Sequence, residues 1–312
     1  MSDQTEPLDI HVIETPEQVR MLELPIVGIR IPEKLFPWLL ATIGACLLLG
    51  WSFLTKLPAI WFDDEGYYSH GVLIPFMTLA AIYMRRDQLK QQPLSQSSIG
   101  FFVMVIGLVL LVLSDRIGTM SVSAGAFIIA VIGAAFFALG PKMGKLLFAP
   151  LAYLVFMMPV LGYFIDKFTN PLQMVATRVA VVMLKVIGYR PEIPANDPNR
   201  IELNYTTWNV GGPCSGFKLL LSLLAFSIFF VMISKLNWVK SLVLVVIISP
   251  ALGLFINGLR IMMIGVVGER WGQKAGAAFH DYSGYIALLI CFVFLHFIVR
   301  FMERGQDVAE QS

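Results

Sequence analysis

The amino-acid sequence predicts an all-α polytopic membrane protein with about eight transmembrane helices. Hydrophobic residues make up 57% of its 312 residues and charged residues only 14%, and the mean hydropathy is +0.74. A soluble domain carries about 25% charged residues, so this chain has too little polar surface to cover a globule in water. The composition therefore argues against a soluble enzyme, a nucleic-acid-binding protein and a disordered chain.

The predicted spans follow from the lengths of the apolar stretches. A hydrocarbon core about 30 Å thick requires about 20 mainly apolar residues per helix. Eight stretches come close to this length and are, in order, 37–55, 69–84, 98–114, 122–140, 147–165, 216–234, 241–260 and 282–300. A ninth stretch, 171–188, is weaker because it starts at Pro171 and carries Arg178 and Lys185. It either crosses the membrane or forms an interfacial or re-entrant helix.

The spans divide the chain into a polar N-terminal tail (1–36), a multi-span membrane domain (37–300) and a short C-terminal tail (301–312). The N-terminal tail lacks the basic start, short apolar run and small-residue cleavage site of a signal peptide. We therefore expect the first span to be an uncleaved membrane anchor.

Basic residues in the short loops predict the orientation, because such residues collect on the cytoplasmic side of a membrane. If 171–188 does not cross, eight spans place all of them on that side: Arg20, Arg30, Lys34, Arg85, Arg86, Lys90, Lys142, Lys145, Lys235, Lys240, Arg300 and Arg304. If it does cross, the last four face outward. The eight-span arrangement agrees better with the rule. It leaves both tails in the cytoplasm, and 189–215 and 261–281 outside.

Cys214 is the predicted nucleophile. It lies in a Gly-Gly-Pro-Cys-Ser-Gly run at the outer mouth of the span 216–234. This run favours a tight turn, and the dipole of a helix that begins there stabilises a thiolate. Cys46 and Cys291 lie within apolar spans and are expected to be buried small hydrophobes. No Cys-x-x-Cys pair or His/Cys cluster predicts a metal site, and we expect neither a metal nor an organic cofactor.

Arg260 is a charged residue within the apolar run 241–268. A guanidinium there costs at least ~2.5–3.5 kcal/mol unless it faces a polar interior or reaches the lipid headgroups. Asn257, three residues earlier, lies on the same helix face. Two interpretations are open: a polar pocket that both side chains share, or an arginine that extends to the outer headgroups.

His280 precedes the last span on the same outer side. A single histidine at a membrane interface is usually a polar cap. Together, however, Cys214, Arg260 and His280 supply the nucleophile, the oxyanion donor and the proton-transfer group that acyl transfer requires.

Ser69 and His70 open the second span on this outer side. They either line the same pocket, which we favour, or belong to an aromatic belt with Trp61, Tyr67 and Tyr68.

Four short motifs occur in order on this chain: Tyr68-Ser69-His70-Gly71, Pro213-Cys214-Ser215-Gly216, Asn257-Gly258-Leu259-Arg260-Ile261, and His280 with Gly284 four residues on. Each motif alone is weakly specific. Together they resemble the exosortase/archaeosortase family over roughly residues 37–300.

The resemblance implies a cysteine-type peptidase or transpeptidase of the bacterial inner membrane, with Cys214 as nucleophile, Arg260 as oxyanion stabiliser and His280 as general acid and base. A supporting pocket would comprise Asn257, His70, Ser69, Ser215 and Gly216. The implied substrates are exported proteins with a PEP-CTERM-type C-terminal sorting signal, and the acceptor is water or a group on a glycan or lipid. The family is associated with exopolysaccharide genes.

Two other classes of function remain open. A polytopic transporter or polysaccharide export component would use Arg260, His280 and His70 to line a substrate path, but such proteins usually contain internal repeats, and we find no repeat in this sequence. A membrane acyl- or glycosyltransferase would not require Cys214.

Overall fold

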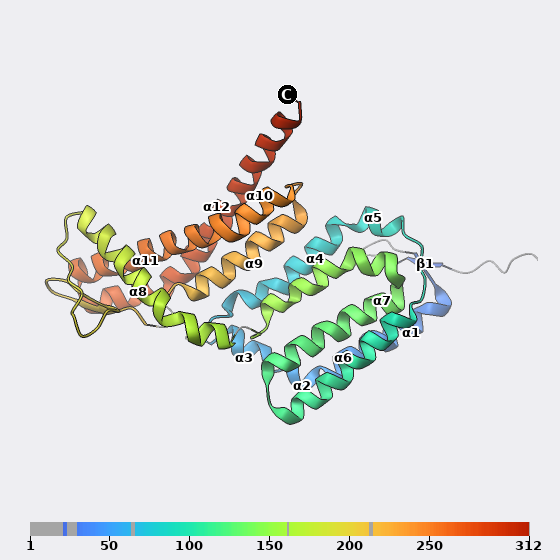
Figure 1. Ribbon diagram of the computed structural model, residues 1–312. Coiled ribbons are helices and arrows are strands. Elements are labelled where there is room, and N and C mark those ends of the chain that lie inside the picture. The colour runs from blue at the N-terminus through green and yellow to red at the C-terminus, as the bar shows by residue number, and fades with distance from the viewer. Residues whose placement is uncertain (1–20, 24–29, 64–65, 161, 212–214, 312) are drawn as a thin grey trace, which may run out of the picture.

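The computed structural model describes residues 21–23, 30–63, 66–160, 162–211 and 215–311. It is mostly helical, with two short antiparallel β-ribbons (Figure 1). The predicted helical class is therefore confirmed.

The N-terminal half begins with the ribbon of β1 (Met21–Glu23) and β2 (Arg30–Pro32). Its helices are η1 (Glu33–Leu35), α1 (Phe36–Leu49), α2 (Trp51–Leu54), α3 (Leu57–Trp61), η2 (Ser69–Leu73), α4 (Ile74–Met84), α5 (Arg86–Lys90), α6 (Ser98–Ile117), α7 (Met120–Tyr153) and η3 (Leu154–Met157).

The C-terminal half holds α8 (Gly162–Val186) and a second ribbon of β3 (Arg200–Glu202) and β4 (Thr207–Asn209). The remaining elements are α9 (Phe217–Ile233), α10 (Trp238–Val243), the π-helical turn η5 (Leu244–Ile248), α11 (Ser249–Trp271) and α12 (Gln273–Gln311).

Several described helices have the length and apolarity of membrane spans. Three stretches are long and apolar enough to cross a membrane: Met120–Met157, Trp238–Trp271 and Gln273–Gly305. The first is two helices that meet at Gly140, where the backbone is non-helical (φ 87°, ψ 171°), as expected of a glycine followed by a proline. Phe36–Leu49 and Trp51–Trp61 pass the same test only when they are taken together, and the chain bends by 58° between them. Shorter apolar helices are Ser69–Met84, Ser98–Ser114 and Phe217–Ile233.

Two predicted spans differ from the observed helices, one in its shape and the other in the residue at which it ends. The span 37–55 is not one straight helix, because the chain bends between α1 and α2 at Gly50. The span 147–165 ends at Met157, and Met158 adopts an extended conformation (φ −120°, ψ 149°). Pro159 follows, and a proline disfavours the helical conformation of the residue before it.

The last two predicted spans, 241–260 and 282–300, are also shorter than the helices that contain them. Helix α11 continues to Trp271 and α12 begins at Gln273, so only Gly272 separates them. Gly272 has a φ of +88°, which glycine adopts without steric cost and which ends α11. An apolar stretch identifies only the part of a helix that is compatible with lipid. The helix itself extends further, because its backbone hydrogen bonds continue into more polar sequence. Arg260 and His280 therefore lie within helices, below the tip of the α11–α12 hairpin.

The weak ninth stretch, 171–188, lies mostly within α8. Among the described helices, α8 is not one of those long and apolar enough to cross a membrane. It packs against α11, where Gly258 faces Val179 and Met183. The Asn-Gly-Leu-Arg motif thus brings α8 close to the helix that carries Arg260.

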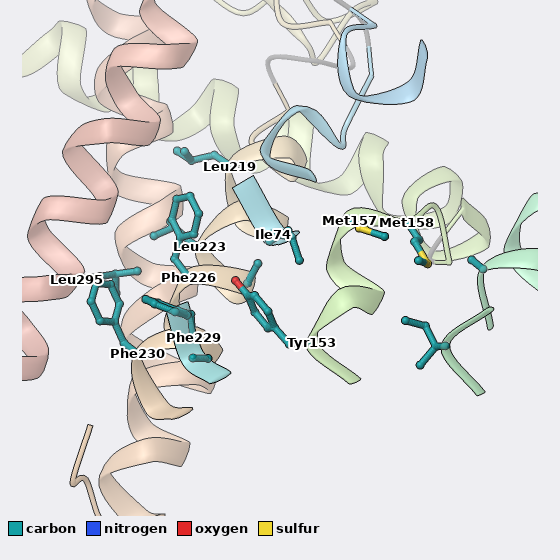
Figure 2. Packing of buried hydrophobic residues seen from close by; sticks show 14 of the residues in the cluster. Ile74, Tyr153, Met157, Met158, Leu219, Leu223, Phe226, Phe229, Phe230 and Leu295 are labelled. Carbon is teal, nitrogen blue, oxygen red and sulfur yellow. The ribbon is translucent and has the colours of Figure 1, made fainter. Parts of the chain in front are cut away.

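A continuous apolar core joins the two halves of the molecule (Figure 2). Phe226 of α9 is almost fully buried and packs edge-on against Phe292 of α12, with ring centroids 5.2 Å apart. On the other side of α9 lie Tyr153 at the end of α7 and Ile74 of α4, both buried. Lipid chains are as apolar as these side chains, so close packing rather than water exclusion holds the helices together. The core fixes α9 between α4 and α12.

The ribbon of β3 and β4 caps the end of the molecule at which α9 begins. The indole of Trp208 packs against Gly268 of α11 and Gly276 of α12, where a Cβ would clash with the ring. The Glu269 carboxylate accepts hydrogen bonds from the Tyr205 backbone N–H (3.1 Å) and the Thr206 hydroxyl (3.0 Å). These contacts fasten the ribbon to the α11–α12 hairpin. They thereby position residues 209–211, which lead into the segment that contains Cys214.

Candidate active site

A cavity of about 450 Å³ lies between α9, α11 and α12, beneath the end of β4. It is lined by Ser69, Asn209, Gly211, Lys218, Leu219, Ser222, Asn257, Arg260, His280, Asp281, Gly284, Tyr285, Ala287 and Leu288. Three segments that are distant in the sequence thus bring their predicted polar residues to one place.

Arg260 of α11 faces α12 and forms hydrogen bonds with it. Its Nε donates to the Ser283 Oγ (3.0 Å), and its Nη2 donates to the backbone carbonyl of His280 (3.2 Å). The Ser283 hydroxyl in turn donates to the same carbonyl (3.0 Å). Of the two interpretations of Arg260, the structure agrees with the polar pocket, because the guanidinium points into the protein and lines the cavity.

His280 is half-buried, and its imidazole Nδ1 lies 3.2 Å from the Asp281 Oδ1. Both residues line the cavity. A carboxylate on one ring nitrogen fixes the tautomer and leaves the other nitrogen to exchange protons with a reactant. His280 can therefore act as a proton-transfer group, with its imidazole oriented by the Asp281 carboxylate.

Asn257 is buried one turn before Arg260 and lies against Gly216. A Cβ on Gly216 would stand 2.9 Å from the Asn257 amide nitrogen, and the φ of Gly216 is +85°. Both observations require glycine at this position. Ser215 is buried, and its hydroxyl accepts a hydrogen bond from the Phe217 backbone N–H (3.1 Å) at the start of α9. Ser215 and Gly216, which follow Cys214, therefore lead into α9, and Gly216 leaves room for the Asn257 side chain.

Ser69 and His70 have different surroundings. Ser69 lines the cavity, whereas His70 is 1% exposed and is not among the lining residues. The His70 ring stacks on Tyr68, with centroids 6.2 Å apart. Tyr68 is itself buried in a cluster with Phe217. The chain thus brings Ser69, but not His70, to the cavity wall, and Tyr68 does not belong to an exposed aromatic belt.

Cys214, the predicted nucleophile, lies outside the described residues, together with Gly212 and Pro213. On either side of this segment, Gly211 lines the cavity and Ser215 is buried at the start of α9. The other two cysteines, Cys46 and Cys291, are free and buried, as predicted. Across the described part of the chain, no three His, Cys, Asp or Glu side chains form a group that could hold a metal ion.

Sequence reasoning missed three residues of the site, of which one is Asp281, the partner of the His280 imidazole. Lys218 lines the cavity from the first turn of α9, and Ser283 binds Arg260. Lys218 left a signal in the sequence, because it is the one charged residue in the apolar segment 217–233. Ser283 left none, since a serine three residues after His280 is common in a helix.

The arrangement brings a fixed cation, a histidine–carboxylate pair and an amide to one cavity, and Gly211, three residues before Cys214 in the sequence, also lines it. Such a set can stabilise an oxyanion and transfer protons, which are the requirements of acyl transfer by a thiol.

Comparison with known proteins identifies the family of the chain. Neither the curated proteins nor the solved structures with which the chain was compared contain a match. Residues 61–297 match the family model described as transmembrane exosortase (Exosortase_EpsH). The match covers well over half of the chain and includes every residue of the cavity wall. The chain therefore belongs to the transmembrane exosortase family, whose members are polytopic membrane proteins.

Proposed function

We propose that this exosortase is a cysteine transpeptidase that cleaves the C-terminal sorting signal of exported proteins at the outer face of the bacterial inner membrane. The observation that carries the proposal is the cavity that joins Arg260, Asn257 and His280 and whose wall includes Gly211, three residues before Cys214 in the sequence. Exosortases act on PEP-CTERM sorting signals, and this cavity has the groups that such chemistry needs.

In the proposed first half-reaction, the Cys214 thiolate attacks the carbonyl carbon of the scissile peptide bond. Arg260 stabilises the negative charge that develops on the carbonyl oxygen. The C–N bond then breaks, and protonated His280 gives its proton to the leaving amine. The products are a thioester on Cys214 and the released C-terminal segment.

In the second half-reaction, neutral His280 takes a proton from the acceptor, which attacks the thioester carbon. The C–S bond breaks and Cys214 is released as the thiolate. With water as the acceptor the outcome is hydrolysis. With an amine or hydroxyl of a glycan or lipid, the exported protein becomes attached to that molecule. Asp281 keeps the His280 imidazole oriented through both steps.

The proposed membrane arrangement has eight spans, with both termini in the cytoplasm and α8 at the outer interface. The loop-rich segment between α8 and α9 lies at one end of the molecule, and β1 and α5 lie at the other (Figure 1). This separation agrees with an outward cavity and a cytoplasmic set of basic loops.

Processing of a substrate in cells tests the proposal. A tagged exported protein with a Pro-Glu-Pro-type sorting tail is co-expressed with the wild type, Cys214→Ala, Arg260→Ala or His280→Ala, and its size is followed on a blot. We expect the wild type to shorten the substrate and each variant, at equal abundance, to lose at least 100-fold in rate. Undiminished cleavage by Cys214→Ala would remove the thiol from the mechanism and favour a transporter or another transferase.

A further inference from the structure

Gly284 is a cavity-lining residue of α12 that the fold does not explain. Its backbone is helical, and glycine in the interior of a helix is unfavourable compared with alanine. Among the described residues, a Cβ at this position would meet only the Arg260 guanidinium, 3.8 Å from Nη2 and 4.0 Å from Cζ. These are ordinary van der Waals distances, so the protein itself has room for a methyl group here.

Other glycines of the α11–α12 hairpin have structural reasons. Gly272 has the positive φ that ends α11. Gly268 and Gly276 lie so close to the Trp208 ring that a Cβ would clash with it. Gly284 has neither a positive φ nor, among the described residues, a contact as close as these. The absence of a side chain at this position therefore serves the cavity that the residue lines.

Gly284 lies between the polar and the apolar part of the cavity wall. His280, Gly284 and Leu288 follow one another at intervals of four residues, which places them on one face of α12, and all three line the cavity. The polar part contains His280 and Arg260, whereas Ala287 and Leu288, farther from the tip of the hairpin, are apolar. A peptide that contacts both parts therefore passes over Gly284.

The proposed chemistry requires space at the same place. The scissile peptide bond must present its carbonyl oxygen to Arg260 and its nitrogen to His280. The Arg260 Nη2 donates a hydrogen bond to the His280 backbone carbonyl, so both residues adjoin the turn of α12 that ends at Gly284. An oxyanion lies about 2.7–3.1 Å from its donors. A methyl group in contact with Nη2 would fill space that the oxyanion and its neighbouring atoms need.

We propose that Gly284 is a specificity-determining residue that leaves the space beside Arg260 to the main chain of the substrate. The scissile peptide bond packs against the bare Cα of Gly284, and the flanking substrate residue that faces α12 is small. A side chain at position 284 competes with that residue for space. The inference rests on the proposed function, because it assigns how the substrate fits the same cavity.

Side-chain size at position 284 tests the proposal in isolated membranes that contain the full-length protein. Wild type, Gly284→Ala and Gly284→Val are compared at equal abundance on a tagged sorting tail, with Cys214→Ala as the background. Mass spectrometry of the segment that the wild type releases locates the cleavage site. Tails in which each residue that flanks this site is replaced in turn by glycine are then compared with the original tail.

Gly305→Ala and Gly305→Val are the matched controls. Gly305 lies in the same helix but outside the cavity wall, and a Cβ there would meet no described atom within 4 Å. Alanine is a better helix former than glycine, so the alanine variants at both positions should retain the fold.

We expect Gly284→Ala to shorten the original tail about tenfold more slowly than the wild type and Gly284→Val about 100-fold more slowly, since misplacement of reacting groups by about 1 Å can have effects of this size. At least one tail with glycine beside the cleavage site should restore most of the rate of Gly284→Ala. Both Gly305 variants should process every tail at the rate of the wild type. Recovery with a smaller substrate distinguishes competition for space from a merely structural role of Gly284.

Two results would overturn the inference and leave the proposed function intact. In the first, Gly284→Val shortens the original tail as fast as the wild type. In the second, the Gly284 variants are equally slow with every tail, which would assign the glycine a structural role. If the wild type shortens no tail in a Cys214-dependent manner, the proposed function itself fails.

Discussion

Ser283 connects Arg260 with the turn of α12 that carries His280. Its hydroxyl accepts a hydrogen bond from the Arg260 Nε and donates one to the backbone carbonyl of His280, which also accepts from the Arg260 Nη2. Two donors of the guanidinium are thereby fixed against one turn of α12. Because a guanidinium is a planar fork, fixing two of its donors sets the direction of the whole group.

Removal of the Ser283 hydroxyl should therefore misdirect Arg260. A hydrogen bond to a charged group contributes about 1.5–3 kcal/mol, and each 1.36 kcal/mol corresponds to a tenfold change in rate. We expect Ser283→Ala to lower the rate of processing at saturating substrate about 10- to 100-fold, with the half-saturating concentration nearly unchanged. Ser283→Thr keeps the hydroxyl and should restore most of the rate. Equal rates for Ser283→Ala and the wild type would show that Arg260 does not depend on this contact.

At the scale of elements, the ribbon of β3 and β4 and the α11–α12 hairpin form one unit. Trp208 fits against Gly268 and Gly276, and Glu269 binds the backbone and side chain of the turn between β3 and β4. The ribbon leads directly into the segment of Cys214, so its attachment determines where that segment lies relative to Arg260.

A larger side chain at Gly276 should detach the ribbon. A Cβ there would clash with the Trp208 ring, so we expect Gly276→Leu to displace Trp208 and slow processing at least tenfold. Protease added from the outer side should then cut the segment 200–209. The matched control is Gly125→Leu, since a Cβ at Gly125 meets no atom within 4 Å. A resistant ribbon and a normal rate in Gly276→Leu would contradict the assigned role of Trp208.

The sequence predicted the helices better than their ends. Apolar stretches located the helical segments, because burial in lipid requires such side chains along the whole span. They did not locate Gly50 as a bend or Gly272 as the tip of a hairpin, since those features depend on backbone conformation and packing. Arg260 and His280 were predicted as site residues from their motifs. Ser283 was not, because the face of α12 that meets α11 follows from tertiary packing alone.

At the scale of the whole molecule, the basic residues do more than orient the spans. Arg85 follows α4, and its Nη2 donates to the Met232 carbonyl in the last turn of α9 (2.9 Å). A cation near the C-terminal end of a helix satisfies its free carbonyls and its dipole. The end of α9 opposite the cavity is thus stabilised by a residue of a predicted cytoplasmic loop.

Accessibility of single cysteines tests this orientation. In a background of Cys46→Ala, Cys214→Ser and Cys291→Ala, a cysteine at Tyr205 should react with a membrane-impermeant maleimide in intact spheroplasts. Tyr205 is 86% exposed in the turn of the outer ribbon. A cysteine at Gln91, which directly follows the basic helix α5, should react only after the membrane is permeabilised. The reverse pattern would place the cavity in the cytoplasm and contradict the proposed topology.

The central claim is that Cys214 forms a covalent bond with the sorting signal. The test uses a sorting-motif peptide that carries a thiol-reactive electrophile at the scissile position. We would add this peptide to membranes that are active in shortening the tail, and then locate the modified residue by mass spectrometry. The account predicts modification of Cys214, its loss in Cys214→Ser, and no modification of the buried Cys46 and Cys291. An unmodified Cys214 in membranes that still shorten the tail would contradict the account.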